Sequence, residues 1–362
     1  MGIPTKHYSG KRSPFPAIAR TLAAVIGVAV LLLTCLALFA VITDYRPDET
    51  SRLTVNGVSG AQTVRRETAY RLLTFDIGFC GLDAARDYYP DGGQQSLADS
   101  ADAAADNLAA VEKALQSAGA DFVFLQEVDV TSRRARKLDQ RTALESLLPG
   151  LVSSFALDFQ VPFLPLPLSS PTGRVESGLL TLSGVAVRES ARHSFTAERS
   201  FPQRLIDRDC CFLALRVAVE GGGELLLVNV HLTDDDTLRA AHLAQLSEFL
   251  QAEAQAGRYI IVGGNWNALL PDTGTAGATA AALSWDLPLP TDFVPPGFHW
   301  AADTERFTRR AGDQPYTEGL SFTASTDGFL LSDNVEALSV KTTDLRFAHA
   351  AHNPALLRFS LR

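Results

Sequence analysis

The stretch Tyr259–Asn267, YIIVGGNWN, decides how the rest of the chain is expected to fold. A short apolar run closed by glycine is typical of a strand that is buried on both faces. Two asparagines, Asn265 and Asn267, follow the glycine pair. The pattern therefore predicts a buried strand whose end carries polar side chains.

Other apolar runs also carry polar residues at or near an end. The runs 71–78, 121–127, 225–231, 329–331 and 356–361 contain or adjoin Asp76, Glu127, Asn229, His231, Asp327 and His352. Each residue alone has an ordinary explanation, because asparagine favours turns and a histidine at a strand end can be structural. Together they predict one site assembled from several strand ends.

Helices and hairpins are both expected between these strands. Segments 211–219 and 225–231 flank three glycines and predict a β-hairpin, whereas segment 238–254 has helical composition after a possible cap at Thr237. Segment 159–171 is rich in proline and is predicted to be irregular. The mixture predicts an α+β class, with mixed sheets flanked by helices.

Charge is distributed unevenly along the 362 residues. The formal net charge is −9, although residues 1–20 contain four basic residues and no acid. The remaining chain is therefore strongly acidic, which argues against strong nucleic-acid binding, since that needs many Lys or Arg contacts to phosphates. The hydrophobic content of 46% excludes a mostly disordered chain.

Residues 21–43 form an uncharged apolar stretch that is long enough to cross a bilayer as a helix. Basic residues precede it, which predicts a cytoplasmic N-terminus and an extracytoplasmic body at the cell membrane. A cleaved signal peptide is the alternative, although its apolar region is usually shorter. The expected organisation is a basic tail at 1–20, a single-pass anchor at 21–43, a polar tether at 44–69 and a domain at 70–362.

Six motifs follow one another along that domain. They are LLTFDIG at 72–78, FLQEVD at 124–129, LVNVHL at 227–232, IVGGNWN at 261–267, STDGFLLS at 325–332 and AAHNP at 350–354. In this order they resemble the endonuclease/exonuclease/phosphatase superfamily of deoxyribonucleases, sphingomyelinases and inositol-phosphate phosphatases. YYPDGG at 88–93 resembles a membrane-anchored bacterial branch. The resemblance implies a four-layer sandwich of two packed mixed β-sheets flanked by helices.

The resemblance also implies the chemistry, which is hydrolysis of a phosphoester with Mg²⁺ (or Mn²⁺). Such a cation takes hard oxygen ligands and polarises the phosphoryl oxygen. The implied residues are the metal ligand Glu127, the catalytic residues His231, Asn267, Asp327 and His352, and Asn229 as a substrate contact. Asp327 is implied to orient His352, and Asn267 to hydrogen-bond the phosphate.

Three positions depart from the family pattern. The family has Asn where Asp76 stands, Asp where Asn265 stands, and Asp where Ala351 stands. Asn265 cannot ionise and Ala351 offers no side-chain oxygen, so metal and water functions are both weakened. One of these positions gains a carboxylate, at Asp76, and another loses one, at Asn265, so the pair still contains one carboxylate. Our hypothesis is that Asp76 and Glu127 still hold a cation.

Two interpretations of function remain open at this stage. The first is a membrane-anchored, metal-dependent phosphoesterase with a degenerate site, acting on a small or lipid-linked phosphoester. The second is a catalytically inactive binding or scaffolding module that retains the same pocket. Asn265 and Ala351 favour the second interpretation, whereas the five retained family residues oppose it.

Overall fold

The computed structural model describes residues 15–279, 281–290 and 292–362, which form two separate units. The first, Met1–Asp44, contains helix α1 (Phe15–Ile42). Its segment Ile18–Ile42 is apolar and long enough to cross a membrane, with a mean hydropathy of 3.0. The expected anchor began three residues later, and residues 1–14 of the expected basic tail lie outside the described residues.

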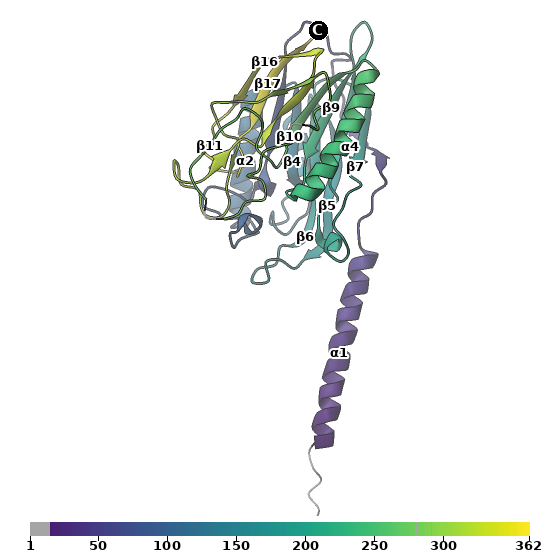
Figure 1. The fold of residues 1–362 in the computed structure, drawn as a ribbon, viewed down its shortest axis with the longest axis vertical. Helices are drawn as coiled ribbons and strands as arrows, with labels where there is room; N and C mark the ends of the chain where they lie inside the picture. The colour runs from purple at the N-terminus through teal and green to yellow at the C-terminus, as the bar shows by residue number, and fades with distance from the viewer. Residues whose placement is uncertain (1–14, 280, 291) are drawn as a thin grey trace, which may run out of the picture. The chain divides into compact units, whose positions relative to one another are not determined.

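The second unit, Tyr45–Arg362, is built on two seven-stranded mixed sheets (Figure 1). The first sheet has the order β1 (Thr50–Arg52), β7 (Val187–Ser194), β8 (Cys211–Ala218), β9 (Glu224–His231), β10 (Tyr259–Asn265), β15 (Asp327–Ser332), β12 (Phe298–Ala301). The second has the order β16 (Val335–Thr342), β17 (Ala355–Leu361), β3 (Tyr70–Asp76), β4 (Phe122–Asp129), β6 (Gly173–Ser183), β5 (Val152–Leu164), β2 (Val55–Asn56).

Smaller elements complete the unit. A third sheet contains β11 (Thr275–Ala276), β14 (Thr323–Ala324) and β13 (Arg309–Arg310). The α-helices are α2 (Ala101–Ala118), α3 (Gln140–Leu147) and α4 (Asp236–Gln255). The 3₁₀ turns are η1 (Gly78–Cys80), η2 (Tyr89–Asp91) and η3 (Gln203–Ile206).

The main core lies between the two large sheets. Alternate residues of each central strand, such as Phe124 of β4 and Leu227 of β9, meet there. The intervening residues face outward, where α4 covers β9 and β10 (Figure 1). On the other sheet, α2 and α3 cover β3 and β4. Because both faces of these strands are covered, their sequences are continuously apolar. The predicted four-layer α+β sandwich is confirmed.

The glycine pair of the YIIVGGNWN stretch is required by close packing. A Cβ on Gly264 would lie 1.9 Å from the carbonyl oxygen of Val230, and one on Gly263 would lie 2.7 Å from the Phe329 ring. A larger residue at either position would push β10 away from β9 or from the core. The glycines therefore let β10 carry Asn265 between its neighbours.

Two local expectations are corrected by the structure. Segment 44–69 is not a free polar tether, since β1 pairs with β7 and β2 pairs with β5, so that it forms an edge of each large sheet. Segment 159–171 is not wholly irregular, because β5 continues to Leu164. Proline is tolerated there because register shifts interrupt the β5–β6 ladder.

Helix α4 begins earlier than expected. Its N-cap is Asp235, whose carboxylate accepts a hydrogen bond from the Leu238 backbone N–H at 3.0 Å, so Thr237 is not the cap. The helix places His242 against the first sheet, stacked on Phe195 with ring centroids 4.2 Å apart. His242 Nε2 lies 2.9 Å from the Ala197 carbonyl oxygen, whereas Nδ1 has no partner.

His242 is predicted to make the fold sensitive to acid. Burial lowers its pKa from 6.5 to about 4. The unfolded chain therefore binds more protons than the folded chain between these values, and stability is lost as pH falls through that window. We expect the free energy of unfolding to fall by about 2 kcal/mol between pH 7 and pH 5 from this residue alone.

Urea unfolding of the full chain at both pH values measures this loss. His242→Gln keeps a hydrogen-bond donor for Ala197 and should reduce the difference by about 2 kcal/mol relative to the wild type. His299→Gln, at a histidine whose side chain is 42% exposed, is the control and should leave the difference unchanged. Equal pH dependence in the wild type and His242→Gln would contradict the assignment.

Candidate active site

A pocket of about 250 Å³ lies at the end of the sandwich where β3, β4, β9 and β10 finish. The inward-facing positions of these strands are apolar in the middle and become polar toward this end. Asp76 follows Leu72 and Thr74 on one face of β3, and His231 follows Leu227 and Asn229 on one face of β9. The same alternation that builds the core therefore builds the pocket.

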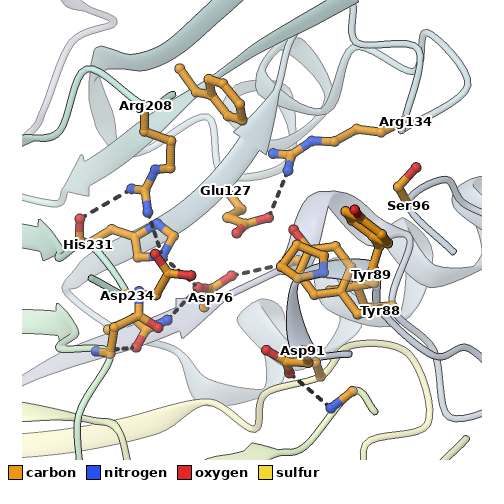
Figure 2. A pocket seen from close by; sticks show the side chains of 18 of the residues that line it. Asp76, Tyr88, Tyr89, Asp91, Ser96, Glu127, Arg134, Arg208, His231 and Asp234 are labelled. Carbon is orange, nitrogen blue, oxygen red and sulfur yellow. Dashed lines mark hydrogen bonds and ion pairs between the residues drawn. The ribbon is translucent and has the colours of Figure 1, made fainter. Parts of the chain in front are cut away.

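Glu127 reaches the pocket through a bulge rather than through simple alternation. The pairing of β4 with β6 shifts between Leu125 and Val128, and Glu127 has a φ of 54°. Such a bulge turns one side chain away from its ladder position. The Glu127 carboxylate thus points into the cavity, beside Arg134 (Figure 2).

Asp76 and Asn265 form a hydrogen-bonded pair across the two sheets. Asn265 Nδ2 donates to Asp76 Oδ2 at 2.9 Å, and the Gly78 backbone N–H donates to Asp76 Oδ1 at 3.0 Å. Burial opposes ionisation of Asp76, but His352, His231 and these donors outweigh it and hold its pKa well below the usual range. The exchange of Asn and Asp keeps one carboxylate in the pocket.

His231 is held as a neutral imidazole. Its Nε2 lies 3.2 Å from Nη1 of Arg208, and because arginine can only donate, Nε2 must carry a lone pair. Burial and the positive charge of Arg208 lower the pKa of His231 well below its usual value. Asp158 holds Arg208 in place with a 2.6 Å ion pair to Nη2.

His352 is in the opposite electrostatic environment. Its Nδ1 lies 2.8 Å from Asp327 Oδ2, and its Nε2 faces Asp76 Oδ2 at 3.9 Å. Burial opposes protonation of His352, but Asp327 and Asp76 outweigh it and raise its pKa. Asp76 Oδ2 also lies 3.6 Å from His231 Nε2. The two histidines therefore flank one carboxylate and favour different protonation states.

Asn267 and Ala351 both line the pocket and differ in what they offer. Asn267 Nδ2 donates to the Leu232 carbonyl oxygen at 2.6 Å, and its Oδ1 accepts from Arg309. One Nδ2 proton remains for a ligand. Ala351 lines the pocket and packs with Phe79 and Leu82, so an apolar wall replaces the family carboxylate.

Of the predicted site residues, Asn229 and Asp327 do not line the pocket, and of these two only Asp327 contacts a residue that does. Asn229 is fully buried between the sheets, where its Oδ1 accepts from Gln126 Nε2 at 2.7 Å. Its Nδ2 contacts the carbonyl oxygens of Leu125 and Leu180 at 3.3 Å. Asn229, two residues before His231 on β9, therefore joins the two sheets through Gln126 and is not the expected substrate contact.

Four arginines were not predicted as site residues but line the pocket. They are Arg134, Arg208, Arg309 and Arg310. The sequence contains Arg134 within the basic run 133–137, yet its side chain is buried, paired with Asp129 and stacked on Phe79 at 4.3 Å. The acid five positions earlier, Asp129, is the one local signal of this burial, because Phe79 is distant in the sequence.

The YYPDGG motif supplies another wall of the pocket. Tyr88, Tyr89 and Pro90 line it, and Asp91 anchors their turn by accepting from the Gly312 backbone N–H at 2.9 Å and Trp285 Nε1 at 3.2 Å (Figure 2). Arg309 stacks on the Trp285 ring at 4.1 Å and lies 3.5 Å from Asp91. The motif therefore positions an arginine next to Asn267.

The described residues offer one group of acidic and imidazole donors suited to a metal ion. Single donor atoms of Asp76, Glu127 and His231 all lie within 4.8 Å of one another. Glu127 Oε2 is buried without a hydrogen-bond partner, with Arg134 Nη1 as an ion-pair contact at 3.3 Å. Burial and Asp76 raise the pKa of Glu127 to about 7 against the opposing effect of Arg134. Two converging carboxylates, one buried and one partly exposed, fit a divalent cation.

Comparisons with known proteins agree with this architecture. Residues 73–342 match the model of the Endonuclease/Exonuclease/phosphatase family. A family structure from Bacteroides vulgatus is 15% identical with a TM-score of 0.52, covering 82% of this chain and 100% of that one. TDP2 of D. rerio complexed with single strand DNA product is 14% identical with a TM-score of 0.51, covering 81% and 100%.

The human Nocturnin catalytic domain with bound sulfate anion is 18% identical with a TM-score of 0.50, covering 86% of this chain and 98% of that one. No curated protein matches the chain. Since the family model spans more than half of the sequence, the chain belongs to the endonuclease/exonuclease/phosphatase family. The family fold supports metal-dependent phosphodiester hydrolysis.

The Asp76–Asn265 pair is predicted to decide cation affinity. Asp76→Asn removes one of the two carboxylates, and we expect calorimetric titration to show Mn²⁺ affinity at least about 10-fold lower. The double variant Asp76→Asn/Asn265→Asp restores a carboxylate on the facing strand and should recover most of the affinity. Unchanged affinity in Asp76→Asn would show that this carboxylate does not bind the cation.

Proposed function

We propose that the chain hydrolyses phosphoesters with a water molecule positioned by Asp76. The observation that carries the proposal is the place of this carboxylate, 3.6 Å from Nε2 of His231 and 3.9 Å from Nε2 of His352. Asn265 holds it there by a hydrogen bond. A substrate phosphate in the same pocket would meet a carboxylate that accepts a hydrogen bond from water and an imidazole that can donate to the leaving oxygen.

The groups around Asp76 support an assignment of roles. The water oxygen bonds to phosphorus while its proton passes to the Asp76 carboxylate, because Arg208 already donates to the lone pair on His231 Nε2. The bond from phosphorus to the leaving oxygen breaks, and that oxygen takes the proton from His352 Nε2. A phosphodiester thereby yields a monoester and an alcohol, and Asp327 stabilises the charged imidazole of His352 before the transfer.

Glu127 and Asp76 are the residues proposed to hold the divalent cation, Mg²⁺ or Mn²⁺. Such a cation would neutralise charge on the phosphoryl oxygens. The remaining donors of the pocket serve the phosphate directly. Asn267 has one free N–H, and Arg309 beside it adds a positive charge that is buried and fixed by Trp285.

The cellular placement that we propose follows from the N-terminal unit. The apolar helix Ile18–Ile42 would anchor the chain as a single pass at the cell membrane. Basic residues before the helix favour a cytoplasmic N-terminus, so the catalytic unit would be extracytoplasmic. Its acidic surface favours a small or lipid-linked phosphoester over a long nucleic acid.

A non-catalytic binding module is the second candidate function, and two observations favour it. Asn265 cannot ionise, and the wall around Ala351 is apolar. The two candidates differ in a simple assay, because a binding module would retain ligand affinity without turnover.

The first test is hydrolysis of bis(p-nitrophenyl) phosphate by the full chain with Mg²⁺ or Mn²⁺. We expect metal-dependent turnover, and Glu127→Gln should reduce it by about 10²-fold or more, because a preorganised catalytic group is lost. Glu145→Gln, at a carboxylate paired with Arg141 outside the pocket, is the matched control and should leave turnover unchanged.

An Asn265→Asp/Ala351→Asp variant separates the two candidate functions. Turnover in the wild type supports hydrolysis through Asp76. Turnover that appears only in the double variant would contradict hydrolysis by the natural chain and support the binding module.

Asp327→Asn tests the role of His352. The amide cannot stabilise a charged imidazole, so we expect kcat to fall by about 10²–10⁴-fold with little change in KM. Asp333→Asn, at an exposed acid outside the pocket, should retain wild-type kcat. A change confined to KM would contradict a role in proton transfer.

A further inference from the structure

Large apolar side chains are exposed around the mouth of the pocket. Phe163 is 51% exposed and Leu168 82% exposed, and both belong to the β5–β6 hairpin. Phe201 is 63% exposed and lies in the connection from β7 to β8. We call these three side chains the apolar rim. Exposed apolar groups gathered in one place commonly mark an interaction surface.

The two segments that carry the rim also form a wall of the pocket. Leu164 and Leu166 from the hairpin and Ile206 from the β7–β8 connection line the cavity. The η3 turn in that connection packs against β5. The rim is therefore continuous with apolar residues that line the pocket.

The chain enters this unit at the same end of the first sheet. Ser194, the last residue of β7, donates through its backbone N–H to the Glu49 carbonyl oxygen and through Oγ to the Asp48 carbonyl oxygen, both at 2.8 Å. Ser194 is opposite Cys211 in the ladder, and Phe212 is opposite Val230. Residues 48–49 thus lie at the end of the sheet where His231 opens into the pocket.

We propose that the apolar rim rests on a lipid bilayer and that the pocket acts on a lipid phosphodiester presented there. This inference rests on the proposed function and specifies its substrate class. The candidate span ends at Ile42 and Tyr45 already belongs to the catalytic unit, so only two residues separate them. Residues 48–49, at the pocket end of the first sheet, thus follow the candidate span closely in sequence.

A bilayer fits the chemistry of this surface. Phenylalanine and leucine side chains enter the boundary between headgroups and acyl chains, where apolar burial stabilises binding. Charged groups at the pocket base would meet the phosphate, while the apolar wall formed by Leu164, Leu166 and Ile206 would meet the lipid stem. A second copy of the chain or an apolar peptide would cover the rim without this match to the pocket.

Site-specific tryptophans test the contact without requiring catalysis. The full chain is reconstituted in phosphatidylcholine/phosphatidylglycerol vesicles with and without brominated acyl chains. Phe163→Trp and Leu168→Trp should give blue-shifted emission that brominated lipid quenches strongly. Val58→Trp is the matched control, since Val58 is 84% exposed next to β2, which pairs with the other end of β5.

The outcomes separate lipid docking from its alternatives. Quenching at Phe163→Trp at least twice that at Val58→Trp supports the contact. Equal quenching at the two positions would overturn it. Blue-shifted emission that brominated lipid does not quench would also overturn it, in favour of a protein partner or a second copy.

Hydrolysis then tests the substrate class separately from the proposed function. Phe163→Ser/Leu168→Ser should lower turnover of vesicle phospholipid by about 10-fold or more, because each lost apolar contact weakens interfacial binding. Its turnover of bis(p-nitrophenyl) phosphate should stay at the wild-type level, as should both activities of Val58→Ser.

Equal loss on both substrates, or no loss on vesicles, would overturn the lipid assignment. If the wild type hydrolyses neither substrate, the proposed function fails, whereas tryptophan quenching still decides whether the rim contacts lipid.

Discussion

A buried hydrogen bond between Asn265 and Asp76 joins the two sheets at the base of the pocket. Its acceptor is a charged carboxylate with almost no exposure to solvent, so losing the donor would leave an expensive unpaired charge. A second bridge, from Gln126 to Asn229, lies one step deeper. The alignment of β3 with β10, and hence the distance between Asp76 and both histidines, depends on these contacts.

The two histidines of the pocket are both buried, so burial alone does not explain why they favour different protonation states. Their charged neighbours cause the difference. Arg208 faces His231 and excludes a proton from Nε2, whereas Asp327 holds His352 and favours its charged form. Each neighbour is itself fixed, Arg208 by Asp158 and Asp327 by a hydrogen bond from Thr326. A shallow, flexible site would not maintain this difference, because water would screen both charges.

Much of the fold was predictable because its signals are local. Apolar runs closed by glycine or polar residues gave the central strands, and the motif order gave the family, which the family match confirms. Strand alternation also explains why Asp76 and His231 converge. It could not show how far along β9 the pocket extends, so Asn229 was placed in the site although it lies in the core.

The residues that sequence reasoning missed come from connections. Arg208 and Arg309 lie outside the apolar runs, and each acquires its role from a partner distant in sequence, Asp158 and Trp285. The pairing of residues 50–56 was equally invisible, because two- and three-residue strands carry no periodicity. Long-range pairing, rather than local propensity, determines all of these positions.

The edge strands β1 and β2 define where a shortened chain can safely begin. Together they satisfy backbone groups of β7 in one sheet and β5 in the other. A protein product starting after residue 56 would expose hydrogen-bonding groups on both sheets at once, and such open edges promote association between molecules. A shortened chain that begins at Tyr45 would keep both sheet edges paired and would also keep the contacts of residues 48–49 with Ser194.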